Sequence, residues 1–266
     1  QEAAEYFVHR LQQQGDDSPV RQYLKRRHLD AKTLASYQIG WALPAWRGLL
    51  THLERKVQSS RADLEKAGLV VQKQGSQGDG FYDRFRGRLM FPLKDVHGKI
   101  IAFAGRVIDQ GEPKYLNSPE TPLYKKGRHL FGLDQAREAI RKEDGVLITE
   151  GYFDQIRCVQ HGIRNVVASC GTALTPAQGE LLKRFTRNVT LVFDSDSAGQ
   201  SAARRGFEVL LEQGMQVKIL VLPPGHDPDS FILQEGGEEF LRQIEIARPY
   251  IESYIMNVAE TDNLGT

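Results

Sequence analysis

The sequence is poor in cysteine and has no long hydrophobic run. Its 2 cysteines among 266 residues, Cys158 and Cys170, fall in a predicted helix and a predicted buried strand, so we expect free core thiols rather than a disulfide or a zinc site. No apolar run approaches the roughly 20 residues needed to span a bilayer. Residues 1–10 also lack the charged-then-apolar pattern of a signal peptide. These absences predict a cytoplasmic globular protein with no membrane partner.

The chain also lacks an appreciable net charge, because 35 Lys and Arg nearly balance 34 Asp and Glu. The two halves differ, however. Residues 1–143 contain 25 Lys and Arg against 17 Asp and Glu, whereas residues 144–266 contain 10 against 17. A basic half joined to an acidic half indicates that one binds a polyanion and the other concentrates cations, although two ordinary solvated faces would give the same counts.

Residues 1–71 have the pattern of several short helices and show no obvious chemistry. The aromatic residues Tyr23, Trp41 and Trp46 are predicted to be core residues rather than ligand-stacking groups. Residues 72–80 are polar and rich in glycine, which predicts a hairpin turn or a loop.

A basic segment follows this connection. Arg84, Arg86 and Arg88 alternate with the period of a strand, so one face would present three guanidinium groups with a spacing suited to backbone phosphates. A second strand at residues 100–107 carries Arg106.

An irregular stretch then adds cations, an aromatic ring and an amide: Lys114, Tyr115, Asn117, Lys125 and Lys126. Basic residues interleaved with aromatic ones can bind a nucleic-acid single strand or a nucleoside triphosphate. The alternative is a solvated edge strand protected by its arginines.

From Gly145 onward, apolar strands alternate with amphipathic helices. The predicted strands are residues 146–149, 165–170, 189–193 and 216–222. This alternation predicts a mostly parallel sheet covered by helices on both faces. Ligands of such sheets bind beyond the carboxyl ends of the strands.

Carboxylates follow three of these strands. Asp194 and Asp196 come directly after the strand at 189–193, two residues apart, so an extended backbone would point both in the same direction. Two adjacent acids repel each other unless a cation or a shared proton lies between them, which favours a hard metal such as magnesium. The alternative is that Asp-Ser-Asp is only a turn and a helix N-cap.

The other acids strengthen the metal hypothesis. Glu150 ends the first strand and Asp154 lies one helical turn later, while Asp227 and Asp229 follow the fourth strand. Each alone is compatible with a helix cap or a turn. Six carboxylates at one edge of a sheet, without local arginines to compensate them, predict metal binding.

These motifs closely resemble those of the RNA polymerase core of bacterial DnaG-type primases, which contains a Toprim domain. The resemblance rests on Glu-Gly-Tyr-Phe-Asp at 150–154, Phe-Asp-Ser-Asp-Ser-Ala-Gly at 193–199 and Asp-Pro-Asp at 227–229. The basic stretches 84–92 and 113–121 precede them, so the resemblance covers nearly the whole chain. Ser195 stands where the family often has glycine.

The resemblance implies an α/β fold in which a Toprim-type, mostly parallel sheet has helices on both faces. The expected regions are an N-terminal mixed α+β basic domain (1–130), a Toprim metal-binding domain (131–225) and a small C-terminal helical region (226–266). Family members normally also have a zinc-binding module and a helicase-binding domain. Neither is visible, so we expect an isolated catalytic core without zinc, with the replicative helicase as a partner only through the missing C-terminal domain.

The function implied is synthesis of short RNA primers on a single-stranded DNA template from ribonucleoside triphosphates, at the replication fork, with an RNA/DNA hybrid as product. Two or more Mg²⁺ or Mn²⁺ ions are expected. By resemblance Glu150, Asp194 and Asp196 are catalytic and hold the metals, with Glu150 a ligand or a general base, and Asp154, Asp227 and Asp229 are nearby or outer-sphere acids. The residues implied to contact template, primer or triphosphate are Arg84, Arg86, Arg88, Arg106, Lys114, Tyr115, Asn117 and Lys125 or Lys126.

Three alternatives remain at this point. A Toprim nuclease would use the same acids but attack with water. A topoisomerase would need a second domain bearing a nucleophilic tyrosine, for which the chain lacks room. A non-catalytic single-strand-binding module would retain the acids as structural groups only.

Overall fold

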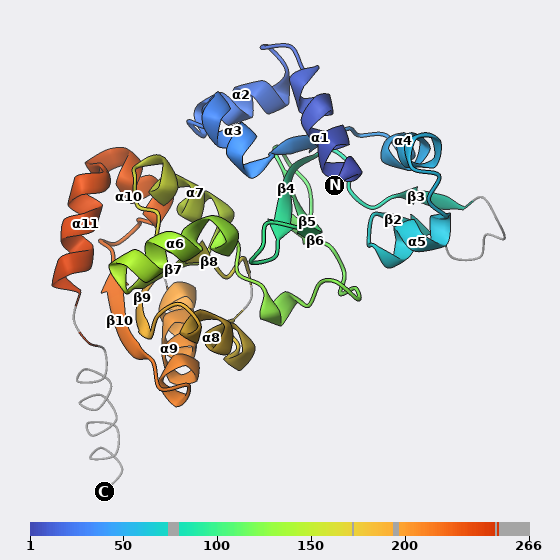
Figure 1. The fold of residues 1–266 in the computed structure, drawn as a ribbon. Helices are drawn as coiled ribbons and strands as arrows, with labels where there is room; N and C mark the ends of the chain where they lie inside the picture. The colour runs from blue at the N-terminus through green and yellow to red at the C-terminus, as the bar shows by residue number, and fades with distance from the viewer. Residues whose placement is uncertain (74–79, 172, 194–196, 248, 250–266) are drawn as a thin grey trace, which may run out of the picture. The chain divides into compact units, whose positions relative to one another are not determined.

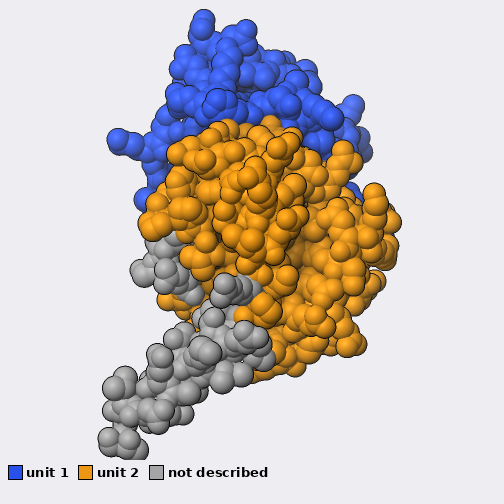
Figure 2. All heavy atoms as spheres, turned by 90° about the vertical axis from the view of Figure 1, so that its left-hand side faces the viewer, with its two compact units in different colours: residues 1–125 blue, residues 126–266 orange. Residues whose placement is uncertain are grey.

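The computed structural model describes residues 1–73, 80–171, 173–193, 197–247 and 249. The chain forms two compact units, Gln1–Lys125 and Lys126–Thr266, which Figure 2 distinguishes by colour. This division falls close to the boundary expected at residue 130, and it places residues 226–247 in the same unit as residues 131–225.

The first unit combines short helices with antiparallel strands (Figure 1). Its elements in chain order are α1 (Glu2–Gln12), α2 (Pro19–Arg26), α3 (Ala31–Tyr37), β1 (Gly40–Ala42), α4 (Gly48–Lys56), α5 (Arg61–Lys66), β2 (Val70–Gln72), β3 (Phe81–Asp83), β4 (Arg88–Lys94), β5 (Ile100–Val107) and β6 (Tyr115–Asn117). The short helices predicted for residues 1–71 are therefore confirmed. Ser18 caps α2 through the backbone N–H of Arg21, and Pro19 occupies the first turn.

An antiparallel sheet with the order β1-β4-β5-β6 forms the centre of the first unit. β4 and β5 are joined by a tight turn in which Gly98 has a φ of 82°, a conformation that glycine adopts without strain. β2 and β3 form a separate antiparallel pair at the ends of the glycine-rich connection. Residues 74–79 of that connection lie outside the described residues.

The core of the first unit lies where α1 and α4 pack against this sheet. Phe7 of α1, Leu50 of α4 and Met90 of β4 are almost completely buried in one cluster. α1 lies very close to β1 because Gly40 has no side chain: a Cβ atom there would lie 2.4 Å from the backbone carbon of Phe7. The apolar residues of α1 recur with the spacing of a helix, and the face that they form packs against the sheet.

The second unit alternates strands and helices (Figure 1). Its elements are η1 (Lys126–Arg128), α6 (Leu133–Glu143), β7 (Val146–Thr149), α7 (Tyr152–Gln160), β8 (Val166–Ala168), α8 (Pro176–Lys183), β9 (Asn188–Phe193), α9 (Ser197–Glu212), β10 (Gln216–Val221), α10 (Pro228–Glu235) and α11 (Gly237–Ile246). The four strands predicted for this half are all present, within two residues of the expected bounds at each end.

The sheet of the second unit is parallel and has the order β10-β9-β7-β8. Helices cover both of its faces. Val192 of β9 packs in a cluster with residues of α7, α10 and α11, whereas Leu191, the preceding residue, lies beside Gly206 of α9. Successive residues of a strand point to opposite faces, so both faces are buried. The predicted fold class is confirmed.

The helices that follow the sheet share its core. Phe231 of α10 and Phe240 of α11 pack in the same cluster as Leu147 of β7 and Leu220 of β10. The region predicted as a separate helical segment thus contributes side chains to the sheet's hydrophobic core, and α10 lies against α7.

Candidate functional site

The carboxyl ends of β7 and β9 lie side by side at one edge of the parallel sheet. Ile148 of β7 pairs with Leu191 of β9, and each strand ends within two residues of that pair. Glu150 directly follows β7 and is partly exposed. Asp194 and Asp196 follow β9 in the sequence, but both lie outside the described residues.

Backbone hydrogen bonds hold the segment around Glu150 in place. The N–H of Cys170 donates to the carbonyl oxygen of Glu150 at 2.9 Å, and the N–H of Ser169 donates to that of Thr149 at 3.1 Å. These two hydrogen bonds join the segment after β7 to the segment after β8. They therefore fix the backbone of Glu150 at the edge of the sheet.

Asp154 is buried and uses both carboxylate oxygens within the protein. Its Oδ2 accepts a hydrogen bond from the N–H of Gly151 at 2.9 Å, which caps the start of α7. Its Oδ1 accepts one from the N–H of Asp229 at 3.2 Å. Asp154 therefore joins the N-terminal ends of α7 and α10.

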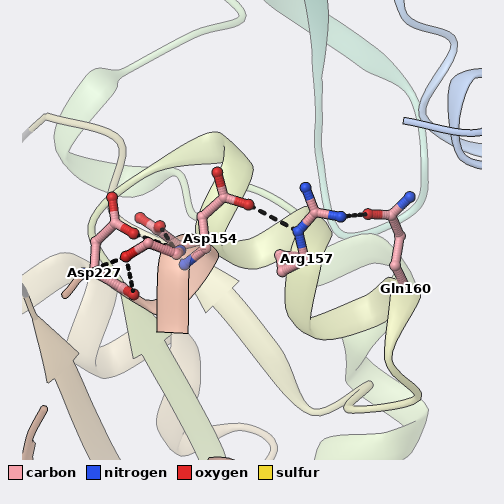
Figure 3. Close-up of polar contacts among 6 residues, drawn as sticks. Asp154, Arg157, Gln160 and Asp227 are labelled. Atoms are coloured by element: carbon pink, nitrogen blue, oxygen red, sulfur yellow. Dashed lines mark hydrogen bonds and ion pairs between the residues drawn. The ribbon is translucent and has the colours of Figure 1, made fainter. Parts of the chain in front are cut away.

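Asp229 forms a buried ion pair with Arg157 of α7. The distance from Arg157 Nε to Asp229 Oδ1 is 2.8 Å, and the two side chains are only 3% and 4% exposed. Arg157 also donates from Nη1 to Gln160 Oε1 at 2.8 Å (Figure 3). The expectation that no local arginine compensates the acids is wrong for Asp229, because the packing of α10 on α7 brings in a cation 72 residues away in sequence.

Asp227 is the N-cap of α10. Its Oδ1 accepts a hydrogen bond from the N–H of Ser230 at 2.7 Å, and its own N–H donates to Ser230 Oγ at 3.1 Å. This is the helix-cap role that was the alternative for the single acids. Within the part of the chain that the structure describes, no three His, Cys, Asp or Glu residues gather closely enough to hold a metal ion.

Both cysteines are free, as predicted, but only Cys158 is a core residue, because Cys170 follows β8 and is partly exposed. Cys158 lies next to Arg157 in α7 and is completely buried. Burial raises the pKa of the Cys158 thiol well above its ordinary value, and the nearby carboxylates of Asp154 and Asp229 raise it further. The thiol is therefore protonated and unreactive in the folded protein.

The three alternating arginines do not share one strand face, so that prediction is wrong. β3 ends at Asp83 and β4 begins at Arg88, with a connection between them. The Asp83 carboxylate accepts hydrogen bonds from the N–H groups of Leu49 and Leu50, at 2.7 and 2.9 Å. That contact with the start of α4, together with the positive φ of Gly87, ends the extended run between the arginines.

Two of these arginines are structural donors. Arg88 is buried and donates from Nη1 to the carbonyl oxygens of Gly105 and Pro113, at 3.1 and 2.9 Å. Arg84 donates from Nη2 to the carbonyl oxygen of Asn117 at 3.2 Å. Burial lowers the pKa of both guanidinium groups below the ordinary value. Both side chains thus bind backbone carbonyl groups of neighbouring segments.

Arg106 is also buried, between two tyrosine rings. Its guanidinium carbon lies 5.5 Å from the ring centre of Tyr23 and 5.1 Å from that of Tyr115, and its Nη1 donates to the Tyr115 hydroxyl at 2.7 Å. Tyr23 is buried, as predicted. The structure thus brings together Arg84 with Asn117, and Arg106 with Tyr115.

The predicted lysines are more accessible. Lys114 is exposed. Lys125 is exposed and its ammonium group lies 3.1 Å from Glu120 Oε2. Lys126 begins η1 in the second unit. Lys114 and Lys125 are therefore accessible to a ligand, in contrast to Arg88 and Arg106, which are buried.

Sequence reasoning misplaced one aromatic residue. Trp41 is buried as predicted, but Trp46 is 66% exposed. The guanidinium carbon of Arg86 lies 4.5 Å from the centre of the Trp46 ring. The sequence signal for this exposure is that Trp46 stands in Pro-Ala-Trp-Arg-Gly, a stretch without the apolar periodicity of a buried element.

Among the described residues, no helix is both long enough and apolar enough to cross a membrane. This finding is consistent with the absence of a long hydrophobic run in the sequence.

Comparisons with known proteins give consistent results along the whole chain. Residues 6–137 match the model of the DNA primase catalytic core, N-terminal domain, and residues 147–232 match the Toprim-like model. The chain is 44% identical to a DNA primase of Clostridium acetobutylicum over 263 residues, which are 99% of this chain and 43% of that protein. The chain thus spans about two fifths of the length of the curated relatives that it matches.

Solved structures show the same similarity. A DNA primase domain from Pseudomonas aeruginosa superimposes with a TM-score of 0.88 at 39% identity, covering 96% of this chain and 80% of that one. A DnaG primase catalytic domain bound to single-stranded DNA gives a TM-score of 0.85 at 38% identity, covering 97% of this chain and 80% of that one.

Proposed function

Because the chain belongs to the family of bacterial DnaG-type DNA primases, we propose that it synthesises short RNA primers on single-stranded DNA by metal-dependent nucleotidyl transfer. Its substrates in this proposal are a single-stranded template and ribonucleoside triphosphates, and its product is an RNA/DNA hybrid. The observation that carries the proposal is the acidic edge of the parallel sheet, where Glu150 follows β7 beside the end of β9.

In this proposal, Glu150, Asp194 and Asp196 hold the divalent ions. All three supply hard oxygen donors, which suit Mg²⁺ or Mn²⁺, and two or more ions are proposed. The described neighbours fit a supporting role: Asp154 already accepts two backbone N–H groups, and Asp229 faces a guanidinium group. Asp227 caps α10. We therefore assign Asp154, Asp227 and Asp229 to outer positions, where they hold the surrounding backbone.

The bound ions would lower the pKa of the attacking 3′-hydroxyl and neutralise charge on the departing pyrophosphate. The chain's own residues hold the reacting groups in position. Glu150 orients its carboxylate from an anchored backbone, and the hydrogen-bonded starts of α7 and α10 keep the loops beside it in place. Positioning of this kind accounts for most of the catalysis of phosphoryl transfer.

The cations of the first unit divide into two groups in this proposal. Lys114 and Lys125 have exposed side chains and Arg86 has a partly exposed one, and all three can contact phosphates of the template or the triphosphate. Arg84, Arg88 and Arg106, with Tyr115 and Asn117, shape the sheet that carries them. Lys126, at the start of the second unit, is assigned to the template, the primer or the triphosphate by the resemblance to the family.

The test is an incubation with single-stranded DNA, Mg²⁺ or Mn²⁺ and labelled ribonucleotides, followed by gel analysis of both strands. We expect labelled RNA to grow with the wild-type protein and to be lost in Glu150→Gln and Asp194→Asn. Glu235→Gln is the matched control, because Glu235 is an exposed acid at the end of α10. Cleavage of the DNA without RNA synthesis would instead establish a nuclease. Binding without either product would establish a non-catalytic module.

A further inference from the structure

Three side chains of the first unit form a cation–aromatic stack: Trp46, which is exposed, and Tyr82 and Arg86, which are partly buried. The guanidinium carbon of Arg86 lies 4.5 Å from the Trp46 ring centre and 5.1 Å from the Tyr82 ring centre. The two rings meet edge to face, with centres 5.5 Å apart and planes at 76°. Trp46 is nevertheless 66% exposed, so much of its surface remains available to a ligand.

The stack is held in place by Asp83, which is buried. The N–H of Asp83 donates to the carbonyl oxygen of Trp46 at 2.7 Å, and its own carbonyl oxygen accepts a hydrogen bond from Arg86. Its carboxylate accepts from the N–H groups of Leu49 and Leu50 at the start of α4. The backbone on both sides of the stack is thus fixed before any ligand arrives, which reduces the entropy that binding must overcome.

The chemistry of the stack selects the kind of ligand. A tryptophan face and a planar guanidinium group both stack on flat, electron-rich rings, and the positive charge attracts an anion. A nucleobase joined to a phosphate combines the two properties. Leu123 offers a contrast, since it is 73% exposed but has no ring and so cannot stack on a base. Scattered exposed residues such as Leu123 are ordinary on protein surfaces.

We propose that Trp46 and Arg86 form a stacking site for an unpaired base of single-stranded DNA, with Tyr82 supporting the Trp46 ring from its edge. The site gives the template a contact to a base face in addition to its contacts to phosphates. It tolerates any sequence, because every base has such a face. The inference rests on the proposed function only in that the template is the ligand, and it makes no use of the acidic edge.

The first experiment measures the affinity for a fluorescently labelled oligothymidylate by anisotropy. We expect Trp46→Ala to weaken binding roughly tenfold and Trp46→Phe to weaken it less. Leu123→Ala, the matched control, should bind as the wild type does. Arg86→Lys retains the charge but loses the planar group, so it should also weaken binding. On an oligonucleotide of abasic residues, the wild type and Trp46→Ala should bind equally.

The second experiment uses the two tryptophans, which differ in exposure. In Trp41→Phe, Trp46 is the only tryptophan, and we expect single-stranded DNA to quench its fluorescence. In Trp46→Phe, only the buried Trp41 remains, and we expect almost no quenching. Circular dichroism of each variant verifies that the first unit is folded, so a loss of binding is not a loss of structure.

The outcomes separate this inference from the proposed function. If single-stranded DNA binds, but Trp46→Ala binds as tightly as the wild type and Trp46 is not quenched, the stacking site is overturned while template binding stands. Equal quenching by fully paired duplex DNA would also overturn it, because paired bases do not present their faces. If neither the wild type nor any variant binds single-stranded DNA, both the stacking site and the proposed template are refuted.

Discussion

Arg157→Met would remove the cation from the buried ion pair of the second unit. In the native structure, Arg157 Nε lies 2.8 Å from Asp229 Oδ1, and both side chains are at most 4% exposed. Methionine retains much of the length and apolar volume of arginine, so the change removes charge and hydrogen bonds without opening a large cavity. The carboxylate of Asp229 is then left buried without the guanidinium group that faces it.

The expected cost follows from that burial. Removing one partner of a buried ion pair typically costs about 3–5 kcal/mol of unfolding free energy, because the remaining charge stays desolvated. The exposed pair Arg141–Glu138, 3.2 Å apart, provides a control, since such pairs contribute about 0–1 kcal/mol. Arg157→Met/Asp229→Leu removes both charges and should recover most of the loss, because an apolar pair leaves no unpaired buried charge.

Cys158 gives a direct assay, because it is the residue after Arg157 and is completely buried. Its reaction with a thiol reagent requires local opening of α7, and peptide mass spectrometry measures it separately from Cys170. We expect Arg157→Met to accelerate the labelling of Cys158 by roughly 100- to 4,000-fold in the regime where reclosing outpaces labelling. Arg141→Met should change it little. Equal labelling rates in Arg157→Met and Arg141→Met would refute the reasoning that the buried pair stabilises this helix.

Three further predictions address packing, capping and pH. Gly40→Ala should lower the stability of the first unit by about 1–3 kcal/mol in urea unfolding, because its Cβ would lie 2.4 Å from Phe7; Gly15→Ala, with nothing within 4 Å, is the control. Asp227→Ala should cost about 1 kcal/mol, visible as faster amide hydrogen exchange in α10. Burial raises the pKa of the Cys158 thiol in the folded state only, so the unfolded chain loses this proton at lower pH than the folded one. Cys158 should therefore lower the stability of the second unit above pH 9.0, by up to about 1.4 kcal/mol per pH unit. An equal slope of unfolding free energy against pH in the wild type and in Cys158→Ala would contradict this.

The sequence predicts the second unit well because its signals are local. Apolar strands of three to six residues alternate with helices that begin at residues suited to capping, such as Thr175, whose side chain accepts from the N–H of Gln178. A parallel sheet then follows from short apolar strands separated by helices. Sequence order also places Glu150 directly after a strand, at the edge where ligands of such sheets bind.

Local signals fail where a distant segment interrupts the pattern. The period of Arg84, Arg86 and Arg88 indicates a strand, but Asp83 turns toward the start of α4 and the strand ends there. The helix N–H groups that Asp83 satisfies are more than 30 residues away in sequence. Trp46 is exposed for a related reason, since its backbone is bonded to Asp83 while its ring stacks on Arg86.

The sequence by itself therefore determined the four strands of the second unit, the family and the positions of the acids after the strands. Only the tertiary structure decided the long-range contacts of Asp154 and Asp229. Asp229 is neutralised by Arg157, 72 residues away, and Asp154 bonds to the N–H of Asp229, 75 residues away. Periodicity and capping depend on neighbours within one or two turns, whereas the charge that faces a buried carboxylate depends on which helices pack together.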